Sequence, residues 1–178
     1  MLICNQYFAI LCNFLNTFST ITKINKMKQI IALLFLMFPA VLSAQQIDYN
    51  TNKGYVAEGY DVVSYFKEKK PVVGQNKFMT RYDGVKFKFS SEINLKIFKE
   101  NPKKYIPQYG GYCAYAVAEK KIKMYIDAEE YEIRDDKLYL FYSSWISSKL
   151  TDWKEGDTKK FQAKADRNWK DLKYKNNR

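Results

Sequence analysis

Alternating apolar and polar positions mark two β-hairpins in this chain. Residues 78–82 and 85–89 flank the pair Asp83-Gly84, and residues 131–134 and 137–141 flank the pair Asp135-Asp136. Such a two-residue turn favours a hairpin because both of its residues tolerate a positive φ. Side chains two apart on a strand share a face. The first hairpin therefore predicts a core-facing set, formed by Phe78, Tyr82, Val85, Phe87 and Phe89.

Helical spacing appears first in the segment after this hairpin. Ile93, Ile97 and Phe98 repeat at helical intervals, and a serine at position 90 or 91 supplies an N-cap. This helix is expected to end at Asn101, since a residue that precedes proline avoids the helical region. An alanine-rich stretch after the Gly-Gly pair at 110–111 predicts a second, shorter helix.

Two more helices are expected near the C-terminus. Ser143 is expected to cap one that carries Ile146, Leu150 and Trp153, and the last begins at about Asp157. Two β-hairpins with three to four short helices predict an α+β fold in one small domain over residues 55–172. A loose polar tail at 45–54 is expected before this domain, and a basic tail at 173–178 after it.

The first 44 residues have the pattern of a leader with a signal peptide. An apolar run at 30–42 follows three lysines and precedes Ser43-Ala44, which is the order of a secretory signal. The run is too short to span a bilayer comfortably. Cleavage near Ala44 would export a mature chain without a membrane span to the periplasm or the extracellular space. Met27 fits the start of a compact signal better than Met1, and a longer leader or a retained anchor is the alternative.

Composition excludes several classes of site. The 178 residues include no histidine, which excludes Ser-His-Asp triads, Cys-His dyads and every His-ligated metal centre. The net charge is +11, but the lysines fall in short, scattered groups such as 67–70 and 103–104. This scatter, together with export, argues against nucleic acid as a partner. Of three cysteines only Cys113 lies beyond the leader, so the mature chain has no internal disulfide.

Several segments carry the motifs of a known family. They read GYDVVSYF at 59–66, YDGVKFKFSS at 82–91, NPKKY at 101–105 and PQYGGYCA at 107–114. With these motifs the chain resembles the exported YHS-domain proteins, a branch sometimes described as YHS domain-containing (seleno)proteins. The resemblance implies a treble-clef-like module related to metal-binding domains. It also implies that the two cysteine ligands of such modules are replaced here by Ser90 and Asn94, which are poor ligands for a soft metal.

Five residues are candidates for a functional site. Cys113 is the candidate catalytic residue, as a redox thiol, because free N–H groups at the start of a helix lower a thiol pKa; a buried structural cysteine is the alternative. The resemblance adds a redox role if Cys113 is where members of the branch carry selenocysteine. The candidate ligand-binding residues are Asp61, Tyr60, Tyr109 and Tyr112. The alternative is that Asp61 is a turn or cap residue and that the tyrosines fill the core. Asp61 and Cys113 are the candidate metal pair.

Three functions stay open from the sequence. The chain offers no complete catalytic set, which favours a non-enzymatic binding or interaction module of the cell envelope. Its partner would be an unknown small molecule or an envelope protein. The first alternative is a thiol-based redox protein that uses Cys113, and the second is a weak metal-binding or metal-handling protein. The cofactor, if there is one, stays unknown.

Overall fold

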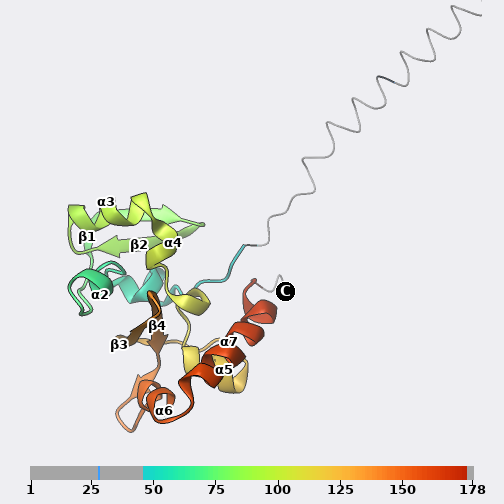
Figure 1. Ribbon diagram of the computed structural model, residues 1–178. Coiled ribbons are helices and arrows are strands. Elements are labelled where there is room, and N and C mark those ends of the chain that lie inside the picture. The colour runs from blue at the N-terminus through green and yellow to red at the C-terminus, as the bar shows by residue number, and fades with distance from the viewer. Residues whose placement is uncertain (1–27, 29–45, 176–178) are drawn as a thin grey trace, which may run out of the picture. The chain divides into compact units, whose positions relative to one another are not determined.

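The computed structural model of the chain describes Lys28 and residues 46–175 (Figure 1). The predicted signal peptide, the start at Met27 and the cleavage near Ala44 lie outside the described residues, as does the end of the basic tail. Residues 46–175 all belong to one compact unit. No helix among the described residues is long and apolar enough to cross a membrane.

Both predicted hairpins are present and are confirmed. Each forms a two-stranded antiparallel sheet, and a third, very short hairpin follows them. The strands are β1 (Gln75–Tyr82) with β2 (Val85–Phe89), β3 (Asp127–Arg134) with β4 (Lys137–Phe141), and β5 (Ser143–Ser144) with β6 (Ser147–Ser148). Both predicted turns have positive φ at their two central residues. β1 and β3 start earlier than expected. In each, the pairing continues beyond a shift in register, which lies between Gln75 and Met79 in β1 and between Asp127 and Tyr131 in β3.

Short helices complete a mixed α+β architecture, as predicted. They are α2 (Ser64–Lys67), α3 (Glu92–Glu100), α4 (Pro102–Tyr105), α5 (Ala114–Lys120), α6 (Lys149–Glu155) and α7 (Thr158–Leu172), with 3₁₀ turns at Asn52–Gly54, Val56–Gly59 and Gln108–Gly111. The Ser91 hydroxyl caps α3 by accepting the N–H of Asn94 at 3.1 Å. The Asp157 carboxylate caps α7 by accepting the N–H of Lys160 at 3.0 Å.

The predicted cap at Ser143 is wrong. Ser143 lies in β5, where its hydroxyl donates to the Asp127 carboxylate at 2.8 Å. The helix starts five residues later and is capped by Ser148, which accepts the N–H of Thr151 at 3.3 Å. The intervening turn leaves Ile146 71% exposed, whereas Trp153 is fully buried as expected. Serines at 143 and 148 carry the same capping signal, and the long-range bond to β3 decides between them.

The segment 46–54, expected to be a loose tail, is held to the rest of the unit. The N–H of Asp48 donates to the Lys173 carbonyl at 2.7 Å, and the N–H of Asn50 donates to the Gly110 carbonyl at 2.9 Å. The side chains of Tyr49 and Asn50 are buried. The side-chain amide of Asn50 also donates to the Gly111 carbonyl at 3.1 Å. Composition alone does not distinguish a polar segment that is held by such bonds from a loose tail.

Two aromatic clusters form much of the core. Phe87 and Phe89 pack against Phe98 with ring centroids 4.8 and 5.0 Å apart. At the second cluster, Trp153 packs against Phe141 and Phe161. Of the predicted core-facing set, Val85, Phe87 and Phe89 are buried, whereas Phe78 and Tyr82 are half-buried at its edge. Figure 1 shows α3 beside the β1–β2 hairpin at one end and α5, α6 and α7 at the other, with β3 and β4 between them.

Candidate functional site

A groove of about 550 Å³ lies between α2, α4, α6 and the β3–β4 hairpin. We call it the basic groove. It is lined by Tyr65, Phe66, Lys67, Lys69, Lys104, Tyr105, Tyr131, Glu132, Ile133, Asp136 and Lys154. The volume falls in the range of small-molecule sites.

The charge of the basic groove is positive. The ammonium groups of Lys67, Lys69, Lys104 and Lys154 make no ion pair with any other residue in the part of the chain that the structure describes. Of the two acids, Glu132 is already engaged, since it accepts Arg134 at 3.1 Å and the Trp153 indole N–H at 2.8 Å. Asp136 alone opposes the four lysines.

Aromatic rings form the walls of the basic groove. Tyr65 and Tyr131 meet edge to face with centroids 4.9 Å apart, and Phe66 and Tyr105 do so at 5.3 Å. The Tyr131 hydroxyl donates to the Lys69 carbonyl at 2.8 Å, which ties β3 to the turn after α2. The walls are therefore pre-organised by contacts between segments that are distant in sequence.

Asp61 is fully buried and its carboxylate is saturated with donors. Oδ1 accepts the N–H of Val63 at 2.9 Å, and Oδ2 accepts the Ser90 N–H at 2.8 Å and the Ser90 hydroxyl at 2.7 Å. The Asn94 amide donates to the same Oδ2 at 2.8 Å. We call these residues the Asp61 network. It joins the segment before α2 to the end of β2 and the first turn of α3, so its observed role is to fix these elements.

The donor set does not fit the thiolate metal centre that the resemblance implies. Ser90 and Asn94, which the resemblance places where such modules carry their two cysteine ligands, both bond Asp61. Cys113, the other proposed ligand, shares no hydrogen-bond partner with Asp61, and Figure 1 shows α5, which Cys113 precedes, far from α2. No group of three or more Cys, Asp or Glu side chains within residues 46–175 is arranged to hold a metal ion.

Cys113 is completely buried at the start of α5. Cys113 is the N-cap of α5, and backbone groups of Tyr142, Ala116 and Tyr115 lower the pKa of its thiol. Burial nevertheless outweighs them and raises that pKa above its ordinary value. This environment favours a neutral thiol, which is a poor nucleophile.

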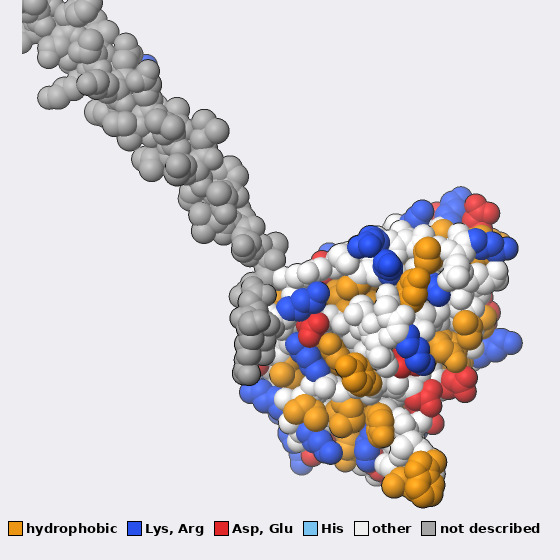
Figure 2. Space-filling model, turned by 180° about the vertical axis from the view of Figure 1, so that it is seen from behind, with side chains coloured by type: hydrophobic (Ala, Val, Ile, Leu, Met, Phe, Trp, Pro, Cys, Tyr) orange, Lys and Arg blue, Asp and Glu red, His pale blue; other side chains and the backbone are white. Residues whose placement is uncertain are grey.

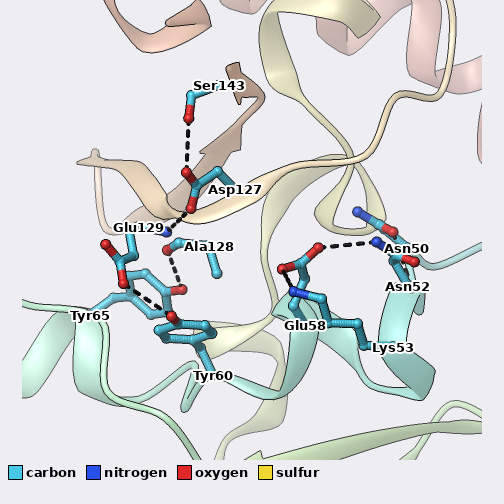
Figure 3. A network of polar contacts seen from close by, with 10 residues as sticks. All are labelled: Asn50, Asn52, Lys53, Glu58, Tyr60, Tyr65, Asp127, Ala128, Glu129 and Ser143. Atoms are coloured by element: carbon cyan, nitrogen blue, oxygen red, sulfur yellow. Dashed lines mark hydrogen bonds and ion pairs between the residues drawn. The ribbon is translucent and has the colours of Figure 1, made fainter. Parts of the chain in front are cut away.

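Tyr60 lies away from the basic groove's lining, on the segment before α2. Its hydroxyl donates to the Glu129 carboxylate at 3.1 Å, and Tyr65 donates to the Ala128 carbonyl at 2.7 Å (Figure 3). Figure 3 shows the ring of Tyr60, from the segment before α2, and the ring of Tyr65, from α2, both pointing towards β3. Burial, followed by the bond to Glu129, raises the pKa of Tyr60. Tyr60 thus serves to hold β3 in place.

Tyr109 and Tyr112 contact α7 and the N-terminal segment. The Tyr109 hydroxyl donates to Asp166 at 2.9 Å, and the Tyr112 hydroxyl donates to Asp48 at 3.2 Å. Both rings lie near Trp169, with centroids 6.1 and 6.3 Å away. Burial raises the pKa of both phenols. The four predicted ligand-binding residues therefore do not converge on one pocket.

These features define a small α+β domain with a pre-organised basic groove and a buried carboxylate network. Residues 63–109 match the family model of the YHS domain, so the chain contains a YHS domain over this stretch. No curated protein and no solved structure matches the chain. The matched residues contribute α2 and α4 to the basic groove, and the β3–β4 hairpin and α6 follow the matched stretch.

Sequence reasoning missed the four lysines of the groove. The groups at 67–70 and 103–104 carry the signal, but separately they look like solvated surface. Figure 2, which views the molecule from behind the view of Figure 1, shows Lys and Arg side chains spread over that face with apolar groups between them. Only the packing of α2 and α4 against β3 and α6 distinguishes the groove lysines from the rest.

Proposed function

We propose that this protein is a binding module whose basic groove takes an anionic small molecule with an apolar or aromatic part. The observation that carries the proposal is the convergence of four unpaired lysines on a groove of about 550 Å³ with aromatic walls. An anion is the ligand that offsets their mutual repulsion. The phenyl rings favour a ligand that also buries apolar surface.

The lysines come from three separate elements, which supports recognition over simple surface charge. Lys67 ends α2, Lys104 lies in α4 and Lys154 lies in α6. The Lys104 ammonium lies 5.9 Å from the Tyr105 ring centroid, so charge and ring are presented together. A phosphate, sulfonate or carboxylate on a ring would contact both.

Titration with phenyl phosphate tests the proposal, with inorganic phosphate and phenol as probes of the two halves. We expect phenyl phosphate to bind more tightly than either half. Changing Lys104 and Lys154 together to Gln should weaken binding by between about twofold and 25-fold, given about 0.2–1 kcal/mol for each exposed ion pair. The matched control changes Lys159 and Lys160 to Gln, which removes the same charge from exposed positions outside the groove. Equal weakening in both variants, or no binding of phenyl phosphate, would overturn the proposal.

Export to the cell envelope is also part of the proposal. Its support is the apolar run at 30–42 with lysines before it and Ser43-Ala44 after it. Fractionation of cells that produce the full chain, followed by mass spectrometry of its N-terminus, tests this step. A chain that starts at Gln45 in the exported fraction is the expected result, and a chain that keeps residues 27–44 inside the cell contradicts it.

The burial of Cys113 and the bonds to Asp61 weigh against the redox and metal alternatives. A reactive thiol needs access and a lowered pKa, whereas Cys113 is buried and its pKa is raised. A metal site at Asp61 would have to displace donors that already saturate the carboxylate. The binding module is therefore the function that we propose.

A further inference from the structure

A second cavity, of about 330 Å³, lies where four segments meet: residues 47–49, the β1–β2 turn, residues 103–110 and α7. We call it the acidic aromatic pocket. The residues that bear on its chemistry are Tyr49, Tyr82, Asp83, Tyr109, Asp166 and Trp169. None of them lines the basic groove, and the inference below is independent of the function proposed for that groove.

Two carboxylates are held in this pocket by tyrosine hydroxyls. Tyr49 donates to Asp83 Oδ2 at 3.0 Å, and Tyr109 donates to Asp166 Oδ1 at 2.9 Å. No described group donates to the other oxygen of either carboxylate, so each keeps one acceptor for a ligand. Burial raises the pKa of Tyr49 and of Tyr109 above the ordinary phenol value, so both phenols stay protonated as hydrogen-bond donors at neutral pH.

The charge of this pocket is opposite to that of the basic groove. Lys103 is the one basic residue in its lining, which also contains the two acidic residues Asp83 and Asp166. This local excess of acid occurs in a chain whose net charge is +11. The lining also contains four aromatic residues, whose ring faces attract cations.

Backbone geometry fixes the ring of Trp169 against this site. Gly110 has φ +61°, and a Cβ there would lie 2.4 Å from the Asp48 carbonyl oxygen and 3.2 Å from the Trp169 ring. The absent side chain lets α7 approach the 3₁₀ turn closely enough for Tyr109 and Trp169 to meet edge to face at 6.1 Å. The pocket wall is therefore built by contacts that tolerate no extra carbon.

From this combination we infer that the acidic aromatic pocket binds a small organic cation, of the quaternary ammonium or alkylamine class. Two carboxylate oxygens would attract its charge, and the rings of Tyr82 and Trp169 would contact its alkyl groups and its positive face. An anion is disfavoured by the same two carboxylates. A purely apolar ligand would cover the two carboxylates without offering a partner for their charge.

Calorimetric titration of the purified chain with choline chloride tests the inference, with dimethylbutanol as the neutral analogue in which carbon replaces nitrogen. We expect choline to bind and dimethylbutanol to bind more weakly. Heat for choline no larger than that for dimethylbutanol would overturn the inference, because shape alone would then account for the contact.

Three single-residue variants localise the site. Asp166→Asn should weaken choline binding by up to about fivefold, the upper value for one exposed ion pair. Asp171→Asn is the matched control, since it removes the same charge from α7 at a residue that pairs with Lys121 outside the pocket. Lys103→Gln should strengthen binding, because it removes the competing cation.

Lys103 is exposed and makes no ion pair with another described residue, so Lys103→Gln tests the site even if Asp166→Asn perturbs the fold. Weaker binding in Lys103→Gln, or equal effects of Asp166→Asn and Asp171→Asn, would contradict a cation site in this pocket. Because phenyl phosphate and choline address different lining residues, failure at one site leaves the result at the other unchanged.

Discussion

Replacing Asp61 by asparagine should destabilise the fold strongly, although the two side chains have nearly the same shape. The carboxylate accepts four hydrogen bonds, three of them at Oδ2, and makes no ion pair with another described residue. An asparagine has one acceptor oxygen. With that oxygen towards Ser90 and Asn94, its amide group faces the N–H of Val63, and donor opposes donor.

The magnitude follows from the number and kind of these bonds. A hydrogen bond to a charged group contributes about 1.5–3 kcal/mol and a neutral one about 0.5–1.5 kcal/mol. At the midpoints of these ranges, weakening three bonds by about 1.25 kcal/mol each and losing one of about 2.25 kcal/mol costs about 6 kcal/mol. Relief of the desolvation of a buried charge offsets part of this cost. We expect the free energy of unfolding to fall by about 3 kcal/mol, and by more in Asp61→Ala, which leaves every donor without an acceptor.

Urea unfolding followed by far-ultraviolet circular dichroism measures this change. Asp171→Asn is the control, because that carboxylate lies on the surface and no change in the urea midpoint is expected. A double-mutant cycle between Asp61→Asn and Ser90→Ala should show coupling of about 1 kcal/mol or more, since the two side chains bond directly. If Asp61→Asn unfolds within about 0.5 kcal/mol of the parent, the Asp61 network does not fix the elements that it joins.

Three further predictions concern buried and exposed positions. Cys113 should react with iodoacetamide far more slowly in the folded chain than in urea at pH 8.5. Because folding raises the pKa of this thiol, its contribution to stability is present below the ordinary thiol pKa and is lost as the pH rises above that value. Equal rates would refute burial. Gly110→Ala should lower the melting temperature more than Gly54→Ala, which has a positive φ of +80° but nothing within 4 Å of a new Cβ; the reverse order would contradict the clash with Asp48. Trp153→Ala should cost about 3–5 kcal/mol in urea unfolding, whereas Trp145→Ala, at a side chain 94% exposed, should change stability by less than about 0.5 kcal/mol.

The local elements of this fold follow from local signals. Both hairpins were predictable because two-residue turns with positive φ select the pairing of their flanking strands. The start of α7 at Asp157 was predictable because its capping bond spans only three residues. Ser143 and Ser148 offered equal local signals, and a bond from Ser143 to Asp127, sixteen residues earlier, determined the outcome.

The arrangement of the sites was beyond sequence reasoning, because it depends on contacts between distant segments. Asp61 was a candidate, but its partners Ser90 and Asn94 lie 29 and 33 residues away. The basic groove brings together Lys69 and Lys154, which lie far apart in the sequence. Periodicity reports which side of an element is buried, but it carries no information about which elements meet.

The Asp61 network leads to a last prediction, on metal dependence. In a small domain a metal ion joins segments that a limited core cannot hold, and its removal unfolds the protein. Here a buried carboxylate joins the segment before α2 to β2 and α3 through four donors, with no thiolate among the participating side chains. We therefore expect the melting temperature of the chain as purified to be the same with and without a strong chelator, and to fall in Asp61→Asn under both conditions. A lower melting temperature in the chelator alone would show that a metal ion contributes to the fold, and the network would then be insufficient as its stabilising link.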